Sequence, residues 1–278
     1  MATGSKAVIY AALFGNGAIA VTKFAASVFT GSSAMLTEAI HSVVDTGNQG
    51  LLLWGLKRAK QPPNTRFPFG HGREIYFWSF VVAIMIFGVG AGVSIFEGIK
   101  HLLHPREITS PTVNYAVLGA AMVFEGVAWW IAFKEFRRAK GEAGYLEAVQ
   151  KGKDPTLFVV LFEDSAAMAG LIVAFLGILL GQITGWLWLD GAASVVIGLI
   201  LAAVALWLAF ETKGLLIGES ASDAVRDQVR NLVSGTGGVE EVHELLTLQM
   251  GPESILVVVS LDFADQVSAD EVENTVAG

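Results

Sequence analysis

The stretch SAMLTEAIHSVVDTGNQGLLLWGLKR, residues 33–58, places ionisable side chains inside a segment that is apolar enough to cross a bilayer. Glu38, His41 and Asp45 follow one another at spacings of three and four, so they share one helix face. Ionisable groups in hydrocarbon are costly, and they usually face a bundle interior, where they pair or bind a metal. An imidazole and a carboxylate at i and i+4 supply half of a divalent-metal site. A helix cap or a polar contact between helices is the alternative interpretation.

A second acidic pair, Glu163 and Asp164, lies inside a later apolar segment and favours the metal interpretation. Asp154-Pro155 opens that segment as an N-cap with proline at the first helical position. At 1.5 Å per residue, the acidic pair lies roughly 14 Å from this start, and His41 and Asp45 lie roughly 12 and 18 Å from the opposite face. The two pairs are therefore expected to meet near the middle of the membrane.

Composition indicates a polytopic membrane protein. The 278 residues are 53% hydrophobic and only 16% charged, and the mean hydropathy is +0.57. The apolar run after Lys6 is too long for a signal-peptide core, so we expect a retained transmembrane helix. Because cysteine is absent, a metal must be held by His, Asp, Glu, carbonyl groups or water. The net charge of −8 and the lack of a basic footprint argue against nucleic acid as a partner.

The predicted fold class is an α-helical polytopic membrane protein with six transmembrane helices and a small α+β, ferredoxin-like C-terminal cytoplasmic domain. The boundary is expected between a transmembrane domain, residues 1–213, and the cytoplasmic domain, residues 214–278. Very short connections predict tight hairpins between the first two and the last two spans. The spans are expected near residues 7–30, 33–58, 76–102, 113–134, 155–182 and 187–211.

Orientation follows from the distribution of Lys and Arg in the loops. Thirteen of these residues fall on the side that holds both termini, whereas only Lys100 and Arg106 fall on the other. Both termini are therefore expected in the cytoplasm, or in the matrix of a mitochondrion. The thirteen are Lys6, Lys57, Arg58, Lys60, Arg66, Arg73, Lys134, Arg137, Arg138, Lys140, Lys151, Lys153 and Lys213.

The C-terminal portion reads as a helix, two strands and a second helix. An amphipathic helix is predicted over residues 223–234, and strands over 242–250 and 255–263, with Gly251-Pro252 as the turn. Ser268 and Glu271 have the spacing of a capping box. A two-stranded sheet of this kind is marginal, so we expect the domain to be truncated or to be completed by a partner.

Three further features of the spans have expected roles. Lys23 lies within the first span, where snorkelling toward the turn is favoured over an ion pair inside the membrane. Small residues at 88–94 and 191–198 predict close helix packing. Glu125, in the fourth span, is expected to act as a proton relay or interhelical hydrogen-bonding group rather than as a direct metal ligand.

Three stretches of the chain are distinctive together: HSVVD in the second span, FPFGHGRE at residues 67–74 and the acid-rich C-terminal segment, residues 219–278. On these stretches rests a resemblance of the whole chain to the cation diffusion facilitator family. TEAIHSVVDTGNQ and LFEDSAAMAG are similar to the branch that includes the animal mitochondrial zinc exporter. The resemblance implies a dimer of six-helix subunits that exchanges divalent metal for protons. It also implies that His41, Asp45 and Asp164 are metal ligands.

The sequence departs from the family pattern at one ligand position. Val160 stands where the family commonly has His or Asp, four residues before Asp164. Glu163, Glu38 or a water is expected to complete the shell. The accessory sites of some relatives are not expected either. His71 has Asn64 and Phe67 where those relatives carry ligands, so it should make a structural hydrogen bond, and His243 is isolated in sequence.

We therefore expect a Zn²⁺/H⁺ antiporter and not an enzyme, in the plasma membrane of a prokaryote, with no cofactor. Metal, protons, the lipid bilayer and a second copy of the chain are the expected partners. The alternatives are a non-transporting metal-sensing or scaffolding membrane dimer and a transporter of something other than metal. The predicted metal ligands are His41, Asp45, Glu163 and Asp164, with Glu38 and Glu125 as a second tier or proton relay.

Overall fold

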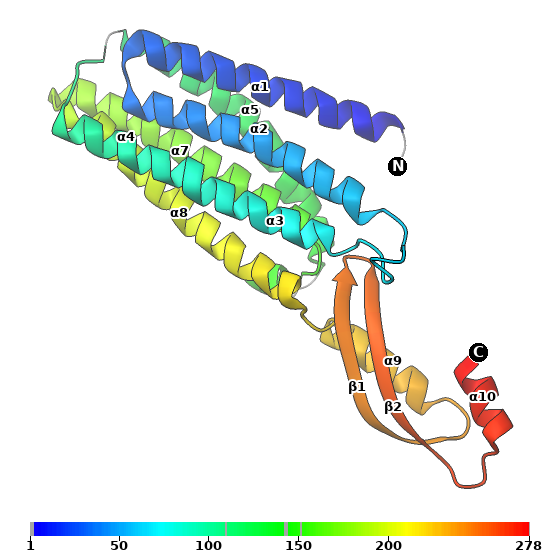
Figure 1. Cartoon of the computed structure of the whole chain (residues 1–278). Helices are drawn as coiled ribbons and strands as arrows, with labels where there is room; N and C mark the ends of the chain where they lie inside the picture. The colour runs from blue at the N-terminus through cyan, green and yellow to red at the C-terminus, as the bar shows by residue number, and fades with distance from the viewer. Residues whose placement is uncertain (1–2, 109, 142–143, 151, 278) are drawn as a thin grey trace.

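A bundle of long helices with a small α+β unit at one end forms the described part of the chain (Figure 1). The computed structural model describes residues 3–108, 110–141, 144–150 and 152–277, with side chains from residue 16 onward except that of Leu146. Lys6 and Lys151, which entered the orientation argument, lie outside the described side chains. The long segments are α1 (Thr3–Thr30), α2 (Ser33–Ala59), α3 (Glu74–Met85) continuing through η1 (Ile86–Ala91) into α4 (Gly92–Leu103), α5 (Pro111–Ala139), α7 (Pro155–Thr184) and α8 (Trp188–Ile217).

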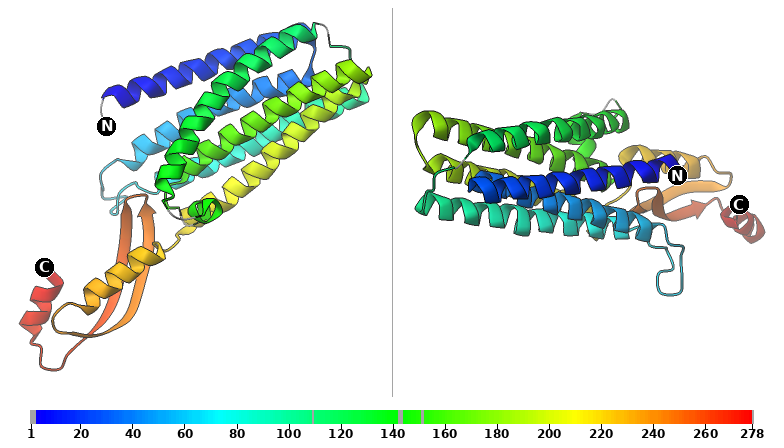
Figure 2. Two further views of the ribbon diagram at one scale, coloured as in Figure 1. Left: turned by 180° about the vertical axis from the view of Figure 1, so that it is seen from behind. Right: turned by 90° about the horizontal axis from the view of Figure 1, so that it is seen from above.

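Four of these segments are long and apolar enough to cross a membrane, as judged over the described residues. They are Glu74–Leu103, Pro111–Ala139, Pro155–Thr184 and Trp188–Ile217. The helices α1 and α2 run alongside them with similar lengths of 28 and 27 residues (Figure 2). In α2, Glu38, Asp45, Lys57 and Arg58 reduce the hydropathy. The prediction of six spans is therefore met by four segments, and the other two remain a prediction.

Local sequence signals account for several helix ends. Asp154 precedes α7 and accepts a 3.0 Å hydrogen bond from the backbone N–H of Thr156, and Pro155 opens the helix, as predicted. The predicted ends of the fourth and sixth spans were too early, because α5 and α8 continue as polar helix to Ala139 and Ile217. A short helix, α6 (Tyr145–Gln150), lies in the connection between α5 and α7.

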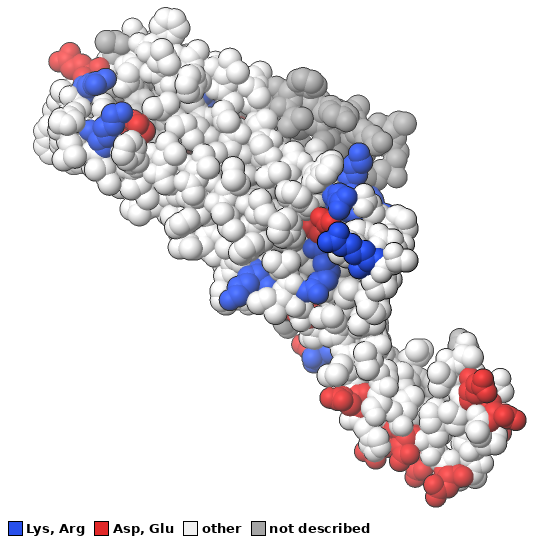
Figure 3. Space-filling model, in the orientation of Figure 1, with Lys and Arg blue, Asp and Glu red and all other residues white. Residues whose placement is uncertain are grey.

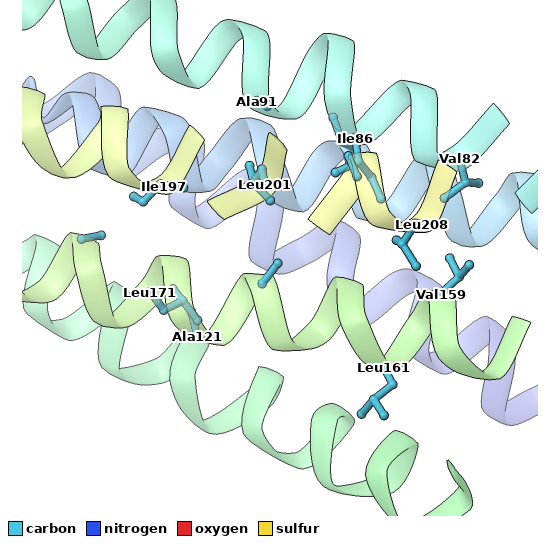
Figure 4. Packing of buried hydrophobic residues seen from close by; sticks show 14 of the residues in the cluster. Val82, Ile86, Ala91, Ala121, Val159, Leu161, Leu171, Ile197, Leu201 and Leu208 are labelled. Atoms are coloured by element: carbon cyan, nitrogen blue, oxygen red, sulfur yellow. The ribbon is translucent and has the colours of Figure 1, made fainter. Parts of the chain in front are cut away.

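Close packing between α4 and α8 depends on small residues. A Cβ at Gly98 would lie 2.7 Å from the Val195 backbone nitrogen, and one at Gly198 would lie 3.0 Å from that of Ile95. The prediction of close packing holds for Gly191 and Gly198, whereas Gly88 has no neighbour within 4 Å of its Cβ position. Gly98 makes a similar close approach, although it lies outside the segments for which close packing was predicted. Apolar side chains from α3, η1, α5, α7 and α8, including those labelled in Figure 4, fill the space between the helices.

A polar cluster ties the α1–α2 turn to α8 at the end of the bundle away from the α+β unit. Asp190 on α8 accepts hydrogen bonds of 2.5 Å from the Ser32 hydroxyl and from the Ser33 backbone N–H. His101 on α4 places Nδ1 3.2 Å from the same carboxyl group. Asp190 therefore caps the first turn of α2 from another helix, and this contact fixes the depth of the residues that follow in α2.

The C-terminal unit has the predicted helix–strand–strand–helix order. It comprises α9 (Asp223–Ser234), β1 (Val239–Gly251), β2 (Ser254–Phe263) and α10 (Ala269–Ala277), and the strands form a two-stranded antiparallel sheet. The capping box is present, since Glu271 Oε2 accepts a 2.8 Å hydrogen bond from the Ser268 backbone N–H. Leu232, Leu246 and Val258 are exposed, so this unit buries little apolar surface within one copy of the chain.

The hairpin turn of this unit rests on the loop before α3. A Cβ at Gly72 would lie 2.5 Å from the carbonyl oxygen of Met250, so only glycine allows this approach. Lys153 and Glu219 form an ion pair of 2.7 Å at the same junction. Figure 3 shows the basic side chains gathered at this end of the bundle and the acidic side chains on the C-terminal unit.

Candidate functional site

The structure brings the two predicted pairs together across the interface of α2 and α7. Asn48 on α2 donates a 2.7 Å hydrogen bond from Nδ2 to Oε1 of Glu163 on α7. The charge of Glu163 also interacts with the Asp45 carboxyl group across the two helices. Two carboxylates at close range repel each other, so a cation or a proton beside them is favoured.

His41 is buried with its hydrogen-bonding capacity unused. The residue is 1% exposed, and neither ring nitrogen has a hydrogen-bond partner among the described residues. Its Nδ1 lies 3.4 Å from Oδ1 of Asp45, one turn along α2. An unsatisfied buried polar atom is expensive, and a metal ion or a proton is a chemically reasonable partner for such an imidazole.

Asp164 and Glu125 extend the acidic group. Both residues are at most 9% exposed, and Glu125 reaches the group from α5. The charge of Glu125 interacts with Asp45, Glu163 and Asp164. The site therefore draws carboxyl groups from three helices, α2, α5 and α7, and such a concentration of negative charge in a bundle favours a cation.

The described side chains do not form a closed metal cage. Among them, no three His, Asp or Glu side chains converge where one ion would fit. Val160, at the position noted above, is partly buried and packs against the hydrophobic core one turn before Asp164. The candidate ligands of α2 and α7 thus lie at one level of the bundle, but they do not converge on a single ion position.

Lys23 corrects one prediction, because it does not snorkel to the turn. Its side chain is fully buried, and Nζ lies 3.2 Å from Oε2 of Glu38, which is also fully buried. Nζ donates a further 2.8 Å hydrogen bond to the Ser42 hydroxyl. Apolar surroundings leave an ammonium group few partners, so an ion pair inside the bundle replaces solvation at the interface. Glu38 therefore faces Lys23, and its charge also interacts with that of Glu125.

The remaining histidines were partly predicted. His71 lies 3.0 Å from the Asn64 side-chain amide through Nε2 and 3.8 Å from Glu74 through Nδ1, which agrees with a hydrogen-bonding role. His243 is not isolated in space, contrary to its appearance in sequence, because two carboxylates lie 3.9 Å from its ring nitrogens. Cross-strand and same-strand neighbours, Asp262 and Glu241, supply them.

Two residues of this region were missed or misjudged, although the sequence held a signal for each. Asn48 follows Asp45 by three residues and His41 by seven, which places all three on one face of α2. Lys23 stands seven residues before the end of α1, and Glu38 stands five residues after the start of α2. Across a tight hairpin these positions have nearly equal depth, which is the condition for an ion pair.

The chain is similar to known cation-efflux proteins. A model of the cation efflux transmembrane domain matches residues 9–217. The mitochondrial proton-coupled zinc antiporter SLC30A9 of Mus musculus is 33% identical over 267 residues, 95% of this chain and 47% of that protein. Metal tolerance protein C4 of Arabidopsis thaliana is 28% identical over 95% of this chain and 58% of its own length. The cation-efflux pump FieF of Escherichia coli is 25% identical over 96% of this chain and 89% of its own length.

The family match covers most of the chain, and the similarity to the zinc antiporters runs through both the bundle and the C-terminal unit. The chain spans about half of the length of the mammalian relatives that it matches. The chain belongs to the cation diffusion facilitator family, near the branch that contains the mitochondrial zinc antiporters.

Proposed function

We propose that this protein is a transporter and not an enzyme, and that it exchanges Zn²⁺ for protons by alternating access across a membrane. The transported ion is held by His41 and Asp45 of α2 and by Glu163 and Asp164 of α7. Glu125 acts beside them as a proton relay. The observation that carries the proposal is the unpaired, fully enclosed imidazole of His41 within a group of carboxyl groups from three helices.

Binding begins with loss of protons from the site. Imidazole and carboxylate coordinate a metal only in their deprotonated forms, so an arriving ion displaces protons. Asp45 and Glu163, whose charges interact, are among the groups that give up protons. The side chains then close on the ion, since in the described structure they lie at one level without converging. Water completes the coordination that Val160 does not supply.

Release follows when the bundle opens to the opposite face. Protons from that compartment compete with the metal for His41 and the carboxyl groups, and protonation weakens the complex. The proton-loaded site then returns to its first orientation. Coupling arises because metal and protons use the same lone pairs and cannot occupy them together.

Zinc is the proposed substrate on two grounds. The ligand set combines one imidazole with carboxylates and contains no thiolate, a set that suits Zn²⁺ and several other divalent ions. The relatives with the highest similarity reported above are named as zinc antiporters. Mn²⁺, Fe²⁺ and Co²⁺ share this ligand chemistry, so they are the ions against which zinc must be compared.

The proposed arrangement in the membrane has six spans, with α1 and α2 crossing beside the four apolar segments. The basic end of the bundle and the C-terminal unit face the cytoplasm of a prokaryotic plasma membrane, as the positive-inside rule favours. Two copies of the chain form the working unit. The small core and exposed apolar side chains of the C-terminal unit support a contact with a second copy there.

Metal uptake into proteoliposomes tests the proposal. Vesicles with an imposed pH gradient are offered Zn²⁺, Mn²⁺, Fe²⁺ and Co²⁺ in turn, with wild type and with His41→Ala. We expect zinc uptake that depends on the gradient and that His41→Ala loses. Folded protein that moves none of these metals would contradict the proposal and favour a non-transporting metal-sensing or scaffolding dimer. Equal uptake by His41→Ala would remove His41 from the ligand set.

A further inference from the structure

A complete ion pair lies inside the bundle next to the proposed metal site, and the transport cycle described above does not use it. Lys23 on α1 and Glu38 on α2 are both fully buried, with Nζ and Oε2 3.2 Å apart. The Ser42 hydroxyl accepts a second hydrogen bond of 2.8 Å from Nζ. The pair therefore joins α1 to α2 at the level of the turn that carries His41.

Glu38 is held in this position by the shape of the bundle. A Cβ at Gly170 on α7 would overlap Oε1 of Glu38, so the missing side chain provides the space for the carboxylate. Oε1 has no hydrogen-bond partner among the described residues, which leaves Lys23 as the main compensation for this buried charge. The geometry directs Oε2 of Glu38 at the ammonium group of Lys23.

Lys23 has other anions within electrostatic range. Its charge interacts with Asp45 on α2, with Glu125 on α5 and with the imidazole of His41. Lysine is a compact point charge on a flexible four-carbon chain, so an ammonium group that lost Glu38 would turn to the nearest remaining carboxylates. One of them, Asp45, is a proposed metal ligand, and the other, Glu125, is the proposed proton relay.

We propose, on the basis of the transport function above, that Glu38 is a positioning residue that keeps the Lys23 ammonium out of the metal site and so sets the affinity for divalent cations. Without Glu38, Lys23 acts as an internal competitor of the metal. The effect of removing Glu38 on zinc affinity should therefore depend on Lys23, because the loss of Glu38 is harmful only while Lys23 is present.

Zinc flux in proteoliposomes separates this role from simple helix anchoring. Glu38→Gln is expected to raise the zinc concentration for half-maximal flux by roughly tenfold, since an added positive charge at this range opposes the ion. The double variant Lys23→Met/Glu38→Gln is expected to return that concentration to within about threefold of wild type, because the competing cation is gone. An anchoring role predicts the opposite order, with the double variant at least as impaired as the single one.

The controls distinguish failure of this inference from failure of the transport assignment. Absence of flux in wild type would overturn the function, whereas wild-type flux with no change in Glu38→Gln would overturn only the role of Glu38. Glu135→Gln removes a carboxylate from an exposed ion pair with Arg138 on α5 and should leave the half-maximal concentration unchanged.

A second comparison applies where Glu38→Gln does not fold. Ser42→Ala removes the other partner of Lys23. It should raise the half-maximal zinc concentration in the wild-type background and have no effect in Lys23→Met/Glu38→Gln. An equal effect of Ser42→Ala in both backgrounds would contradict the proposal.

Discussion

The side-chain amide of Asn48 on α2 donates a 2.7 Å hydrogen bond to Glu163 on α7, and this contact orients a proposed metal ligand from the opposite helix. Both residues are at most 3% exposed, so no water competes for the contact. The amide also occupies one oxygen of Glu163 and leaves the rest of the carboxyl group to face Asp45. A change in the distance between α2 and α7 would therefore shift the Glu163 carboxyl group within the site.

Removal of this bond should weaken metal binding without abolishing it. For Asn48→Ala we expect a loss of about 1 kcal/mol, or roughly fivefold in zinc affinity, because Glu163 loses its orienting donor. Equilibrium zinc binding to purified protein measures the effect. Gln182→Ala, which removes a side-chain amide near the far end of α7, provides the control. Equal zinc affinity in wild type and Asn48→Ala would contradict an orienting role.

Val160 offers a gain-of-ligand experiment. Val160→His places an imidazole one turn before Asp164, where two side chains on one helix can share a metal. We expect zinc binding to tighten by about tenfold, or 1.4 kcal/mol, and turnover to slow because release becomes harder. Leu157→His puts the same group on the exposed side of α7 and should change neither quantity. Unaltered binding in Val160→His would place residue 160 outside the coordination sphere.

The contact of the hairpin turn with Gly72 predicts a local packing defect. In Gly72→Ala the new methyl group would lie 2.5 Å from the Met250 carbonyl oxygen, so the C-terminal unit must move away from the loop. We expect a loss of about 1–3 kcal/mol in unfolding free energy, measured by thermal or chemical denaturation in detergent. Gly237→Ala adds a methyl group with no neighbour within 4 Å and should be nearly neutral. Equal stability of the two variants would contradict the contact.

The capping box of α10 gives the C-terminal unit a defined pH dependence. Hydrogen bonds from the Ser268 backbone N–H and hydroxyl lower the pKa of Glu271 from its ordinary value. A lowered pKa in the folded state means that the cap is fully formed above the ordinary glutamate pKa and is lost as pH falls through the lowered one. Protection of the α10 amides from hydrogen exchange should therefore decrease as the pH falls below the ordinary glutamate pKa of about 4.3.

The matched variants for this pH effect are both on α10. Glu271→Gln should remove most of the pH dependence, and Glu273→Gln, which changes an exposed acid two residues later, should retain it. Identical pH profiles for wild type and Glu271→Gln would show that the ionised cap does not stabilise α10.

Much of the fold is predictable here because local chemistry and tertiary structure agree. Asp154-Pro155 and the Ser268–Glu271 spacing predict helix starts, and the structure confirms both. The proximity of Asp45 on α2 to Glu163 on α7 is also predictable, since ionisable groups inside a bundle tend to lie beside one another, whereas the role of either residue as a metal ligand stays a prediction. These signals depend on a few neighbouring residues or on one simple energetic rule.

Other features depend on residues from a second helix, so the sequence of one segment alone does not predict them. The π-helical turn Ile86–Ala91 packs on α8, and nothing in IFGVGA alone requires it. Lys23 was expected to snorkel toward the nearby turn, and Glu38 was expected as a second-tier or proton-relay residue of the metal site, whereas the structure pairs the two. The competition between Glu38 as ligand and Glu38 as counter-ion is decided by the packing of α1 against α2.

If metal and protons exchange through one site, the two ions must move together, and measuring both at once tests this. Proteoliposomes carry a zinc indicator and a pH indicator, and zinc is added outside with no initial pH difference. We expect zinc entry to drive protons out, and we expect Asp45→Asn to lose both movements together. Zinc entry without proton exit, or proton exit that persists in Asp45→Asn while zinc entry stops, would contradict a shared site.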